Sequence, residues 1–230
     1  MSVVSSFGEL YDKTLYPVFA NFTVSTDVFE VKEYDTNPKV MTKLLSVEQS
    51  GAEFASFNHM LVKGMGDITE KRSSKFENHD CDGVTFVSNQ GYNGLIFSEL
   101  KSKFSTQKLC EAYQQMTHSF LKMHAMLSLC KDYTLEDMSL HFIAACQCFE
   151  DKNQEVGVYN RLSKEEQVDR TTFVSKFLRR LIEHHDVTVK FGELVEVWDL
   201  PLSQKLADKE ITLSLQVTKS FGDTSLVYTY

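Results

Sequence analysis

The chain has 230 residues, of which 42% are hydrophobic and 24% are charged, as in an ordinary globular domain. Its formal net charge of −8 excludes a generally basic nucleic-acid-binding surface, so any nucleic-acid contact must depend on a local patch or on a partner subunit. We expect a single domain over residues 1–230, with a core at about 40–200 and peripheral elaborations at 1–38 and 201–230.

Cysteine usage and the first residues predict the cellular compartment. The chain contains five cysteines, an odd number, and no Cys-x-x-Cys pattern, which favours a reducing compartment over a disulfide framework. The opening MSVVSSFGELYDK lacks the basic and apolar regions of a signal peptide. No apolar run approaches the roughly 20 residues of a membrane-spanning helix. We therefore expect a cytoplasmic protein with no membrane partner.

The first third of the chain predicts a strand followed by a helix. Residues 19–35, FANFTVSTDVFEVKEYD, alternate in places and indicate a strand or hairpin, and Pro38 marks a turn. Roughly helical spacing is shared by the apolar residues of the next segment, Leu44, Leu45, Phe54, Phe57, Met60 and Leu61. This spacing predicts a helix from Lys39 to about Lys63, ended by Gly64-Met-Gly66.

The middle of the chain predicts a β-hairpin followed by a long helix. Val84–Val87 and Leu95–Phe97 are β-prone runs, and the Gly/Asn-rich segment 89–94 between them is typical of a hairpin turn. Ser105 is a good helix cap, and apolar residues then recur at helical spacing from Thr106 to about Leu129.

The last third predicts alternating strands and helices. Met138–Phe149 is almost continuously apolar, which suits a strand covered on both faces. Ser163-Lys-Glu-Glu166 resembles a capping box and predicts a helix to about His184, with inward side chains at Phe173, Phe177, Leu178 and Leu181. We expect a strand over Val187–Trp198 and two strands within Lys209–Tyr230. The interleaved order predicts an α/β fold with a mixed sheet.

The hairpin carries an acid at its head, Asp82, and ends in Glu99-Leu100-Lys101. Residues two apart in a strand face the same way, so Glu99 and Lys101 share a face and Leu100 points to the other. The hairpin should bring Asp82 beside Glu99. Mg²⁺ takes one or two carboxylates together with waters and substrate phosphate, and a neighbouring lysine can orient or help to deprotonate the attacking water. The pattern therefore predicts a metal-dependent phosphodiesterase site.

Two alternatives to this interpretation stay open at the level of sequence. A Glu-x-Lys pair on an exposed edge strand is commonly a solvated ion pair. Asp80 competes with Asp82 for the role of ligand, although Asp82 directly precedes the Gly83-Val-Thr-Phe86 strand. If Asp82 and Glu99 do converge without a cation, their repulsion predicts that removing either one leaves the stability of the fold unchanged or slightly raised.

Asp82, Glu99-Leu100-Lys101 and the following helix with Gln115 resemble the PD-(D/E)xK nuclease superfamily over about residues 40–150. The resemblance implies a restriction-endonuclease-like mixed β-sheet flanked by helices, here with β-rich additions at both ends. It also implies that Asp82 and Glu99 bind Mg²⁺ or Mn²⁺, that Lys101 serves the nucleophilic water and that Gln115 supports the site. Cys81 stands where the family pattern has a proline.

The resemblance implies a further acid from the preceding helix, and the candidates that we cannot separate are Glu48, Glu53 and Glu70. The function that it implies is a metal-dependent deoxyribonuclease that hydrolyses phosphodiester bonds. Since the chain is acidic and has no recognisable DNA-reading module, a protein partner or homo-oligomer is expected to supply specificity, as in effectors of prokaryotic anti-phage defence. The alternative is a non-catalytic interaction protein that retains the nuclease fold.

Overall fold

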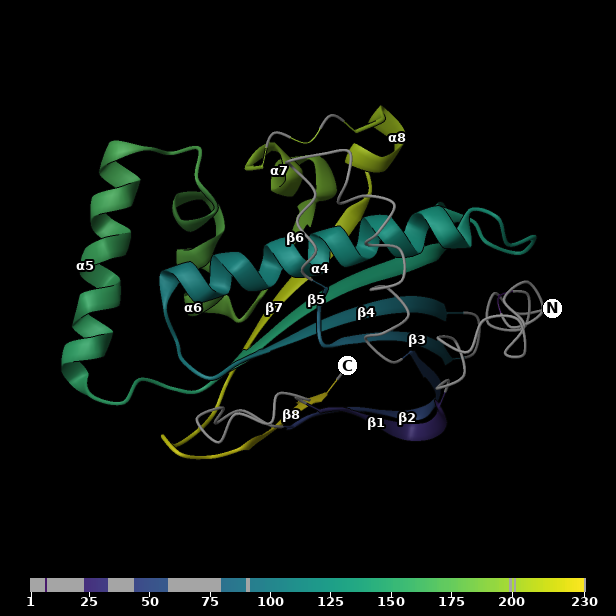
Figure 1. Cartoon of the computed structure of the whole chain (residues 1–230), viewed down its shortest axis with the longest axis horizontal. Coiled ribbons are helices and arrows are strands. Elements are labelled where there is room, and N and C mark those ends of the chain that lie inside the picture. Colours follow the sequence, from purple (N-terminus) through teal and green to yellow (C-terminus); the bar gives the residue numbers. More distant parts are fainter. Residues whose placement is uncertain are drawn as a thin grey trace.

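The structure is a computed structural model that describes residues 7, 23–32, 44–57, 80–89, 92–198, 200 and 202–229. These residues form one mixed sheet of eight strands with helices against it (Figure 1). The strands are β1 Thr23–Lys32, β2 Leu44–Phe57, β3 Gly83–Asn89, β4 Tyr92–Lys101, β5 Met138–Cys146, β6 Asp186–Lys190, β7 Glu210–Val217 and β8 Ser225–Thr229. The helical elements are α4 Thr106–Leu127, η2 Leu135–Asp137, α5 Lys152–Val168, η3 Val174–Leu178, α6 Arg179–His184, α7 Phe191–Glu196 and α8 Gln204–Ala207.

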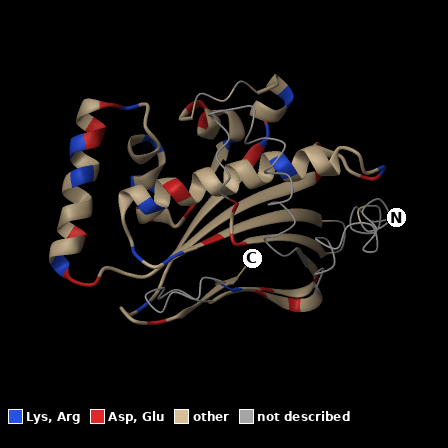
Figure 2. Cartoon of the chain, viewed as in Figure 1, with Lys and Arg blue, Asp and Glu red and all other residues tan. Residues whose placement is uncertain are grey.

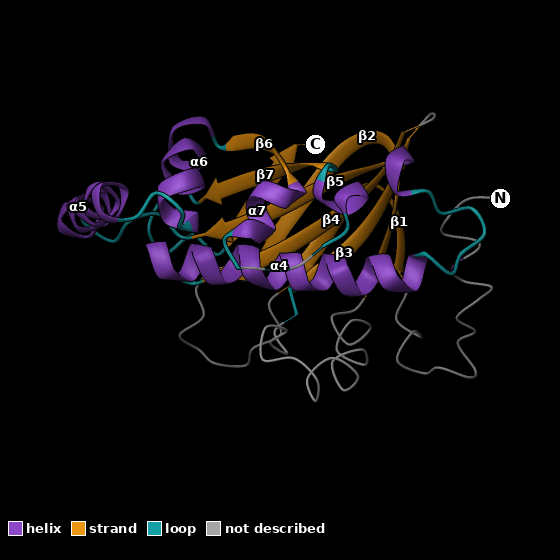
Figure 3. Cartoon of the chain, turned by 90° about the horizontal axis from the view of Figure 1, so that it is seen from above, coloured by secondary structure: helices purple, strands orange, loops and turns teal. Residues whose placement is uncertain are grey.

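The sheet has the strand order β1-β2-β3-β4-β5-β7-β6, and β8 pairs with β2. Strands β1 to β4 pair antiparallel in succession, whereas β5 is parallel to β4 and β7 is parallel to β5. Because adjacent parallel strands need a crossover, the chain passes through α4 between β4 and β5. Helix α4 lies across the strands on one face of the sheet (Figures 1 and 3).

Two hydrophobic cores lie on the two faces of the sheet. The larger joins α4 to the near face of the central strands and includes Phe97, Tyr113, Phe120 and Phe142, all with 0% exposure. The smaller lies on the far face, where β1, β2 and β8 close over it, and includes Leu100. Helix α5 buries Val158 and Leu162, packs Tyr159 partly against the core and carries charges of both signs along its length (Figure 2).

Four predicted features are confirmed in the described residues. Residues 83–101 form an antiparallel hairpin. Ser105 accepts a hydrogen bond from the Lys108 amide and caps α4, which ends at Leu127, two residues earlier than predicted. Residues 138–146 of the apolar run predicted at 138–149 form the buried strand β5, and β1 lies within the β-rich segment predicted near the N-terminus. Among the described residues, no helix combines the length and apolarity needed to cross a membrane.

The helix predicted over residues 39–63 is wrong where the structure describes it, since residues 44–57 form β2. Leu45 and Val47 are buried before Gly51, but Ala52 and Phe54 are buried after it, so the inward positions change parity. The pairing with β1 shifts register at this point, Gly51 has φ 75° and its amide binds Asp27 Oδ1 at 2.6 Å. The bulge interrupts the two-residue alternation and thereby imitates helical spacing.

The helix start predicted at Ser163 is also wrong. Ser163 lies inside α5, whose cap is Asp151, with Oδ1 accepting from the Gln154 amide at 2.8 Å. The chain leaves helical geometry after Val168 and resumes it in η3 and α6. The four side chains predicted to point inward from this region, Phe173, Phe177, Leu178 and Leu181, are buried as expected.

The C-terminal part differs from the prediction in two further ways. The strand predicted over residues 187–198 ends at Lys190, and α7 begins at Phe191 because the buried positions change from alternation to Phe191, Leu194 and Val195. The two predicted tail strands are present as β7 and β8. However, β7 lies between β5 and β6 and not at the periphery, so residues after 201 contribute an interior strand of the sheet.

Candidate active site

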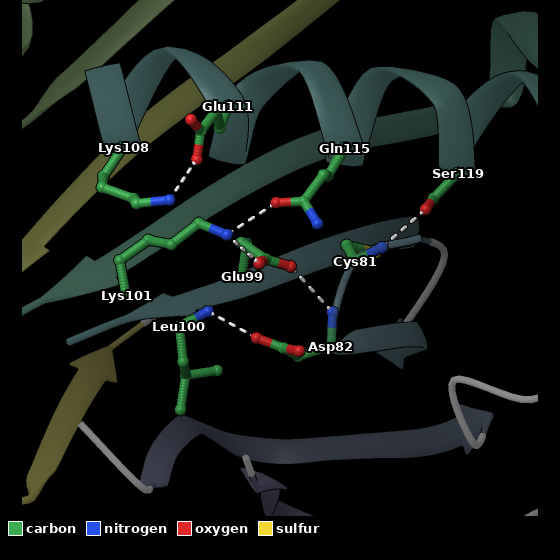
Figure 4. A network of polar contacts seen from close by, with 9 residues as sticks. All are labelled: Cys81, Asp82, Glu99, Leu100, Lys101, Lys108, Glu111, Gln115 and Ser119. Carbon is green, nitrogen blue, oxygen red and sulfur yellow. Dashed lines mark hydrogen bonds and ion pairs between the residues drawn. The ribbon is translucent and has the colours of Figure 1, made fainter. Parts of the chain in front are cut away.

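The hairpin positions the predicted acids at one end of the β3–β4 pair. Its register pairs Gly83 with Ser98, which places Asp82 next to Glu99. Glu99 and Lys101 point towards α4, whereas Leu100 points into the far core (Figure 4). The alternation of the strand therefore separates a charged face from an apolar face, as the Glu-x-Lys spacing predicts.

Each acid of the pair is held by the opposite strand. The Asp82 amide donates to Glu99 Oε2 at 3.1 Å, and the Leu100 amide donates to Asp82 Oδ2 at 2.7 Å. The carboxylate of each residue thus accepts a backbone hydrogen bond from the neighbouring strand, beyond the last regular pair of the ladder. Because the Asp82 amide contacts Glu99 and the Asp82 carboxylate contacts the amide of the next residue, Leu100, the two acids are neighbours across the strands (Figure 4).

Lys101 links the strand to the long helix. Its ammonium donates to Glu99 Oε1 at 2.5 Å and to Gln115 Oε1 at 2.6 Å. The Glu99 side chain is 4% exposed and that of Lys101 is 14% exposed, so this is a buried ion pair that reaches solvent on the lysine side. Gln115 therefore faces this end of the hairpin, and Ala112 and Met116 beside it are buried.

Helix α4 presents a polar row to this end of the hairpin. Glu111, Gln115 and Ser119 are spaced by four residues and therefore lie on one face of the helix. Ser119 Oγ accepts from the Cys81 amide at 2.9 Å, and Lys108 binds Glu111 at 2.6 Å. Sequence reasoning missed Ser119 and Glu111, although their spacing of four residues on either side of Gln115 is a usable signal.

Asp80 has a partner of its own. Its Oδ1 accepts from Lys122 Nζ at 2.5 Å, and the two side chains are 8% and 1% exposed. This engagement makes Asp80 the weaker candidate for a ligand, and it leaves Asp82 as the acid that faces Glu99. Lys122 is one turn beyond Ser119 on the same helix.

Two pKa values report on the local environment. Burial, with the nearby charges of Glu99, Asp82 and Asp80, raises the pKa of the Cys81 thiol well above its ordinary value, so this cysteine is not a nucleophile. The hydrogen bond from Lys108, with a smaller contribution from the charge of Lys101, lowers the pKa of Glu111. Glu111 is therefore ionised at neutral pH beside the ion pair.

The further acid expected from an upstream helix is not found in the described residues. Glu48 and Glu53 are exposed and lie on β2, which is a strand. The pairing of Glu53 with Ser88 and of Phe57 with Val84 places both acids away from the Asp82 end of β3. Glu70 lies outside the described residues.

The described residues contain no group of three or more His, Cys, Asp or Glu side chains that could hold a metal ion. A pair of carboxylates is nevertheless the protein contribution that Mg²⁺ usually takes, because waters and substrate phosphate complete its octahedral shell. Asp82 and Glu99, adjacent on neighbouring strands, fit this requirement. Their oxygens are at the same time well satisfied by Lys101 and by backbone amides.

A hollow of about 220 Å³ lies near the other end of α4. In it the pKa of His124 is lowered by burial, and the imidazole Nδ1 lies 2.8 Å from the Tyr133 hydroxyl. The remaining charges there, Glu136 and Lys205, form an exposed ion pair at 2.8 Å. This hollow offers no pair of buried acids, so we place the candidate site at Asp82, Glu99, Lys101 and Gln115.

Comparison of the chain with protein-family models, with curated proteins and with solved structures gives no significant match. The assignment of a function therefore depends on the chemistry of these four residues and of the groups that hold them.

Proposed function

We propose that this protein is a metal-dependent nuclease of the PD-(D/E)xK type, with a restriction-endonuclease-like core. The observation that carries the proposal is the convergence of Asp82 with the Glu99–Lys101 pair and Gln115 from α4. An acid, a second acid two residues before a lysine, and a helical glutamine are the elements of the family resemblance. They come from separate segments, and they meet at the end of one hairpin.

The roles of the four residues follow from their contacts. Asp82 and Glu99 would hold Mg²⁺ or Mn²⁺, which when bound acidifies water and stabilises negative charge on phosphate oxygens. Glu99 and Gln115 fix the Lys101 ammonium between strand and helix. From that position Lys101 would orient the attacking water or neutralise charge on the phosphate. The backbone bonds between the two strands keep the acids in place while substrate binds.

A local basic segment beside the site suits a phosphate backbone. Residues 100–110 contain Lys101, Lys103 and Lys108 and no acid, although the net charge of the chain is −8. Lys103 and Lys108 are both exposed, but Lys108 is paired with Glu111, so Lys103 is the better placed of the two to contact phosphates of a strand that enters the site. We propose DNA as the substrate. Because this segment is short, we also propose that a partner protein or a second copy supplies specificity, as in a defence effector.

A second candidate is a non-catalytic interaction protein that retains this fold. The observation that favours it is that the Glu99–Lys101 pair is already satisfied by contacts within the chain. In that case the pair is a buried structural link between β4 and α4, and neither a divalent ion nor a phosphate has a role.

The test is incubation of the purified chain with supercoiled plasmid, linear duplex, single-stranded DNA and RNA, each with Mg²⁺, Mn²⁺ or EDTA. The proposal expects metal-dependent cleavage of at least one DNA substrate and none in EDTA. Glu99→Gln protein, purified in parallel, serves as the control for contaminating nucleases. Cleavage by Glu99→Gln protein at the wild-type rate would contradict the proposed site, and cleavage of RNA alone would correct the substrate.

A further inference from the structure

The segment 80–82 lies before the first regular pair of β3, yet it carries the proposed ligand Asp82. The β3–β4 pairing begins at Gly83, so the ladder alone does not fix the backbone of the three preceding residues. Two side chains of α4 hold this segment from the helix side. Ser119 accepts from the Cys81 amide at 2.9 Å, and Lys122 binds the Asp80 carboxylate at 2.5 Å.

These contacts are deeply buried. The side chains of Lys122 and Asp80 are 1% and 8% exposed, and Ser119 is 0% exposed. Asp80 Oδ2 is buried and has no hydrogen-bond partner among the described residues. Burial of a charged pair costs desolvation that the mutual attraction often does not recover, and an apolar pair of similar volume is often as stable. A stabilising role is therefore a weak explanation for this pair.

The same helix also positions the other half of the site. Gln115, Ser119 and Lys122 follow one another at intervals of four and three residues, so they lie on one face of α4. Gln115 binds Lys101, Ser119 binds the amide of Cys81 and Lys122 binds Asp80. Figure 4 shows the contacts of Gln115 and Ser119. One helix thus contacts both Lys101 and the segment that carries Asp82, in addition to the hydrogen bonds of Asp82 with Glu99 and Leu100.

We infer that Lys122 and Ser119 are positioning residues for Asp82, acting through the Asp80 carboxylate and the Cys81 amide. The inference rests on the proposed function, because it assigns Asp82 a divalent cation. Groups that orient a metal ligand influence the affinity for the ion as well as the chemistry, and their loss typically weakens binding by 10- to 100-fold.

The test measures Mn²⁺ affinity by electron paramagnetic resonance and needs no nuclease activity. The variant is Asp80→Asn combined with Lys122→Met, which removes the tether while conserving net charge and approximate volume. We expect a folded protein, by circular dichroism and thermal unfolding, whose affinity for Mn²⁺ is at least about tenfold weaker. The single variant Lys122→Arg keeps the positive charge and the hydrogen-bond donors, so it should retain most of the wild-type affinity for Mn²⁺.

Ser119→Ala gives a second, milder test that does not alter charge, and we expect it to weaken Mn²⁺ binding by about threefold to tenfold. Glu166→Gln combined with Arg179→Met is the matched control. It neutralises an ion pair with two contacts of 2.8 Å between α5 and the η3–α6 segment, outside the site, and should leave the Mn²⁺ affinity unchanged.

Wild-type affinity in both the Asp80/Lys122 variant and Ser119→Ala would overturn the positioning role and leave the nuclease proposal intact. Absence of Mn²⁺ binding by the wild-type protein would overturn the proposed function itself, and this inference with it.

Discussion

Two polar clusters lie on opposite faces of the same sheet. One contains buried charged groups that pair with each other, and the other contains neutral groups. The site cluster, Asp82, Glu99, Lys101 and Gln115, faces α4 and contains full charges. The underside cluster, Tyr92, His141, Ser214 and Tyr228, lies on the far face near β8. There Tyr92 Oη lies 3.3 Å from His141 Nε2, and Ser214 Oγ lies 3.4 Å from Tyr228 Oη.

The underside cluster is neutral at physiological pH. Burial lowers the pKa of His141 to about 4, although the charge of Asp186 acts in the opposite direction. Its hydroxyls and imidazole form two hydrogen-bonded pairs, Tyr92 with His141 and Ser214 with Tyr228, and neither pair contains a full charge. The site cluster keeps an acid that is 3% exposed and supplies a lysine to pair with it. Buried charges are costly, and the underside cluster shows that neutral groups can fill a buried polar position in this sheet. The charges of the site cluster are therefore a physical reason to expect chemistry on the α4 face.

The largest expected difference between the clusters is in cleavage. Lys101→Met should lower the rate of DNA cleavage by at least about 100-fold, because in the proposed mechanism Lys101 serves the attacking water. Mn²⁺ binding should persist, since Lys101 is not a ligand. Tyr92→Phe, on the far face, should cleave at the wild-type rate. A nicking assay under single-turnover conditions measures both, and equal rates for the two variants would remove the functional distinction between the clusters.

The next difference is in stability. Glu99→Ala should lower the free energy of unfolding by about 3–5 kcal/mol, because it leaves Lys101 buried without its counter-charge. The structure thus replaces the sequence-based expectation that repulsion makes loss of an acid harmless, since Glu99 binds both Lys101 and the Asp82 amide. Tyr92→Phe should cost about 1 kcal/mol. The measurement is urea denaturation without metal.

Two control variants test whether the loss of stability in Glu99→Ala comes from a buried unpaired charge. Glu99→Gln combined with Lys101→Met should recover most of the loss, because neither charge is then left alone. Glu165→Ala, which breaks the exposed pair with Arg161 on α5, should change the free energy of unfolding by less than about 1 kcal/mol. A cost for Glu99→Ala as small as that for Glu165→Ala would show that the site pair behaves as a surface ion pair.

The underside cluster predicts a pH dependence. Between its ordinary pKa of 6.5 and the folded value of about 4, His141 is protonated in the unfolded chain but not in the folded protein. Stability should therefore fall as the pH falls through this window, by up to about 1.4 kcal/mol per pH unit from this residue. In His141→Gln protein the slope should be smaller by that amount. Parallel stability-against-pH curves for the two proteins would contradict a neutral, buried His141.

The smallest effect is expected at the margin of the site cluster. Lys103→Glu should weaken DNA binding by a few fold and reduce the slope of log affinity against log salt by about 1, because one phosphate contact is lost. Binding is measured with Ca²⁺ in place of Mg²⁺ at several salt concentrations. Lys219→Glu, an exposed lysine after β7, is the matched control. The same slope for both variants and wild type would place the DNA backbone elsewhere.

Much of the site follows from local sequence rules. The parity of Glu99 and Lys101, the hairpin that brings Asp82 to Glu99, the Ser105 cap and the inward side of α4 all depend on neighbours within a few residues or across one tight turn. For that reason the sequence predicts Glu99 and Lys101 on one face of the hairpin, and the family resemblance adds Gln115; the structure brings these three residues into contact.

Three features depend on residues that are far apart in the sequence: the strand at residues 44–57, the position of β7 in the sheet and the partner of Asp80. Pairing with β1, β3 and β8 makes residues 44–57 a strand in spite of the bulge opposite Asp27, and β7 inserts between β5 and β6 because buried parallel strands need partners on both sides. The tertiary structure also decided that Lys122, 42 residues from Asp80, pairs with that acid and leaves Asp82 to face Glu99. Burial is a property of the whole packed chain, so sequence alone could not distinguish a buried Glu-x-Lys pair from a solvated one.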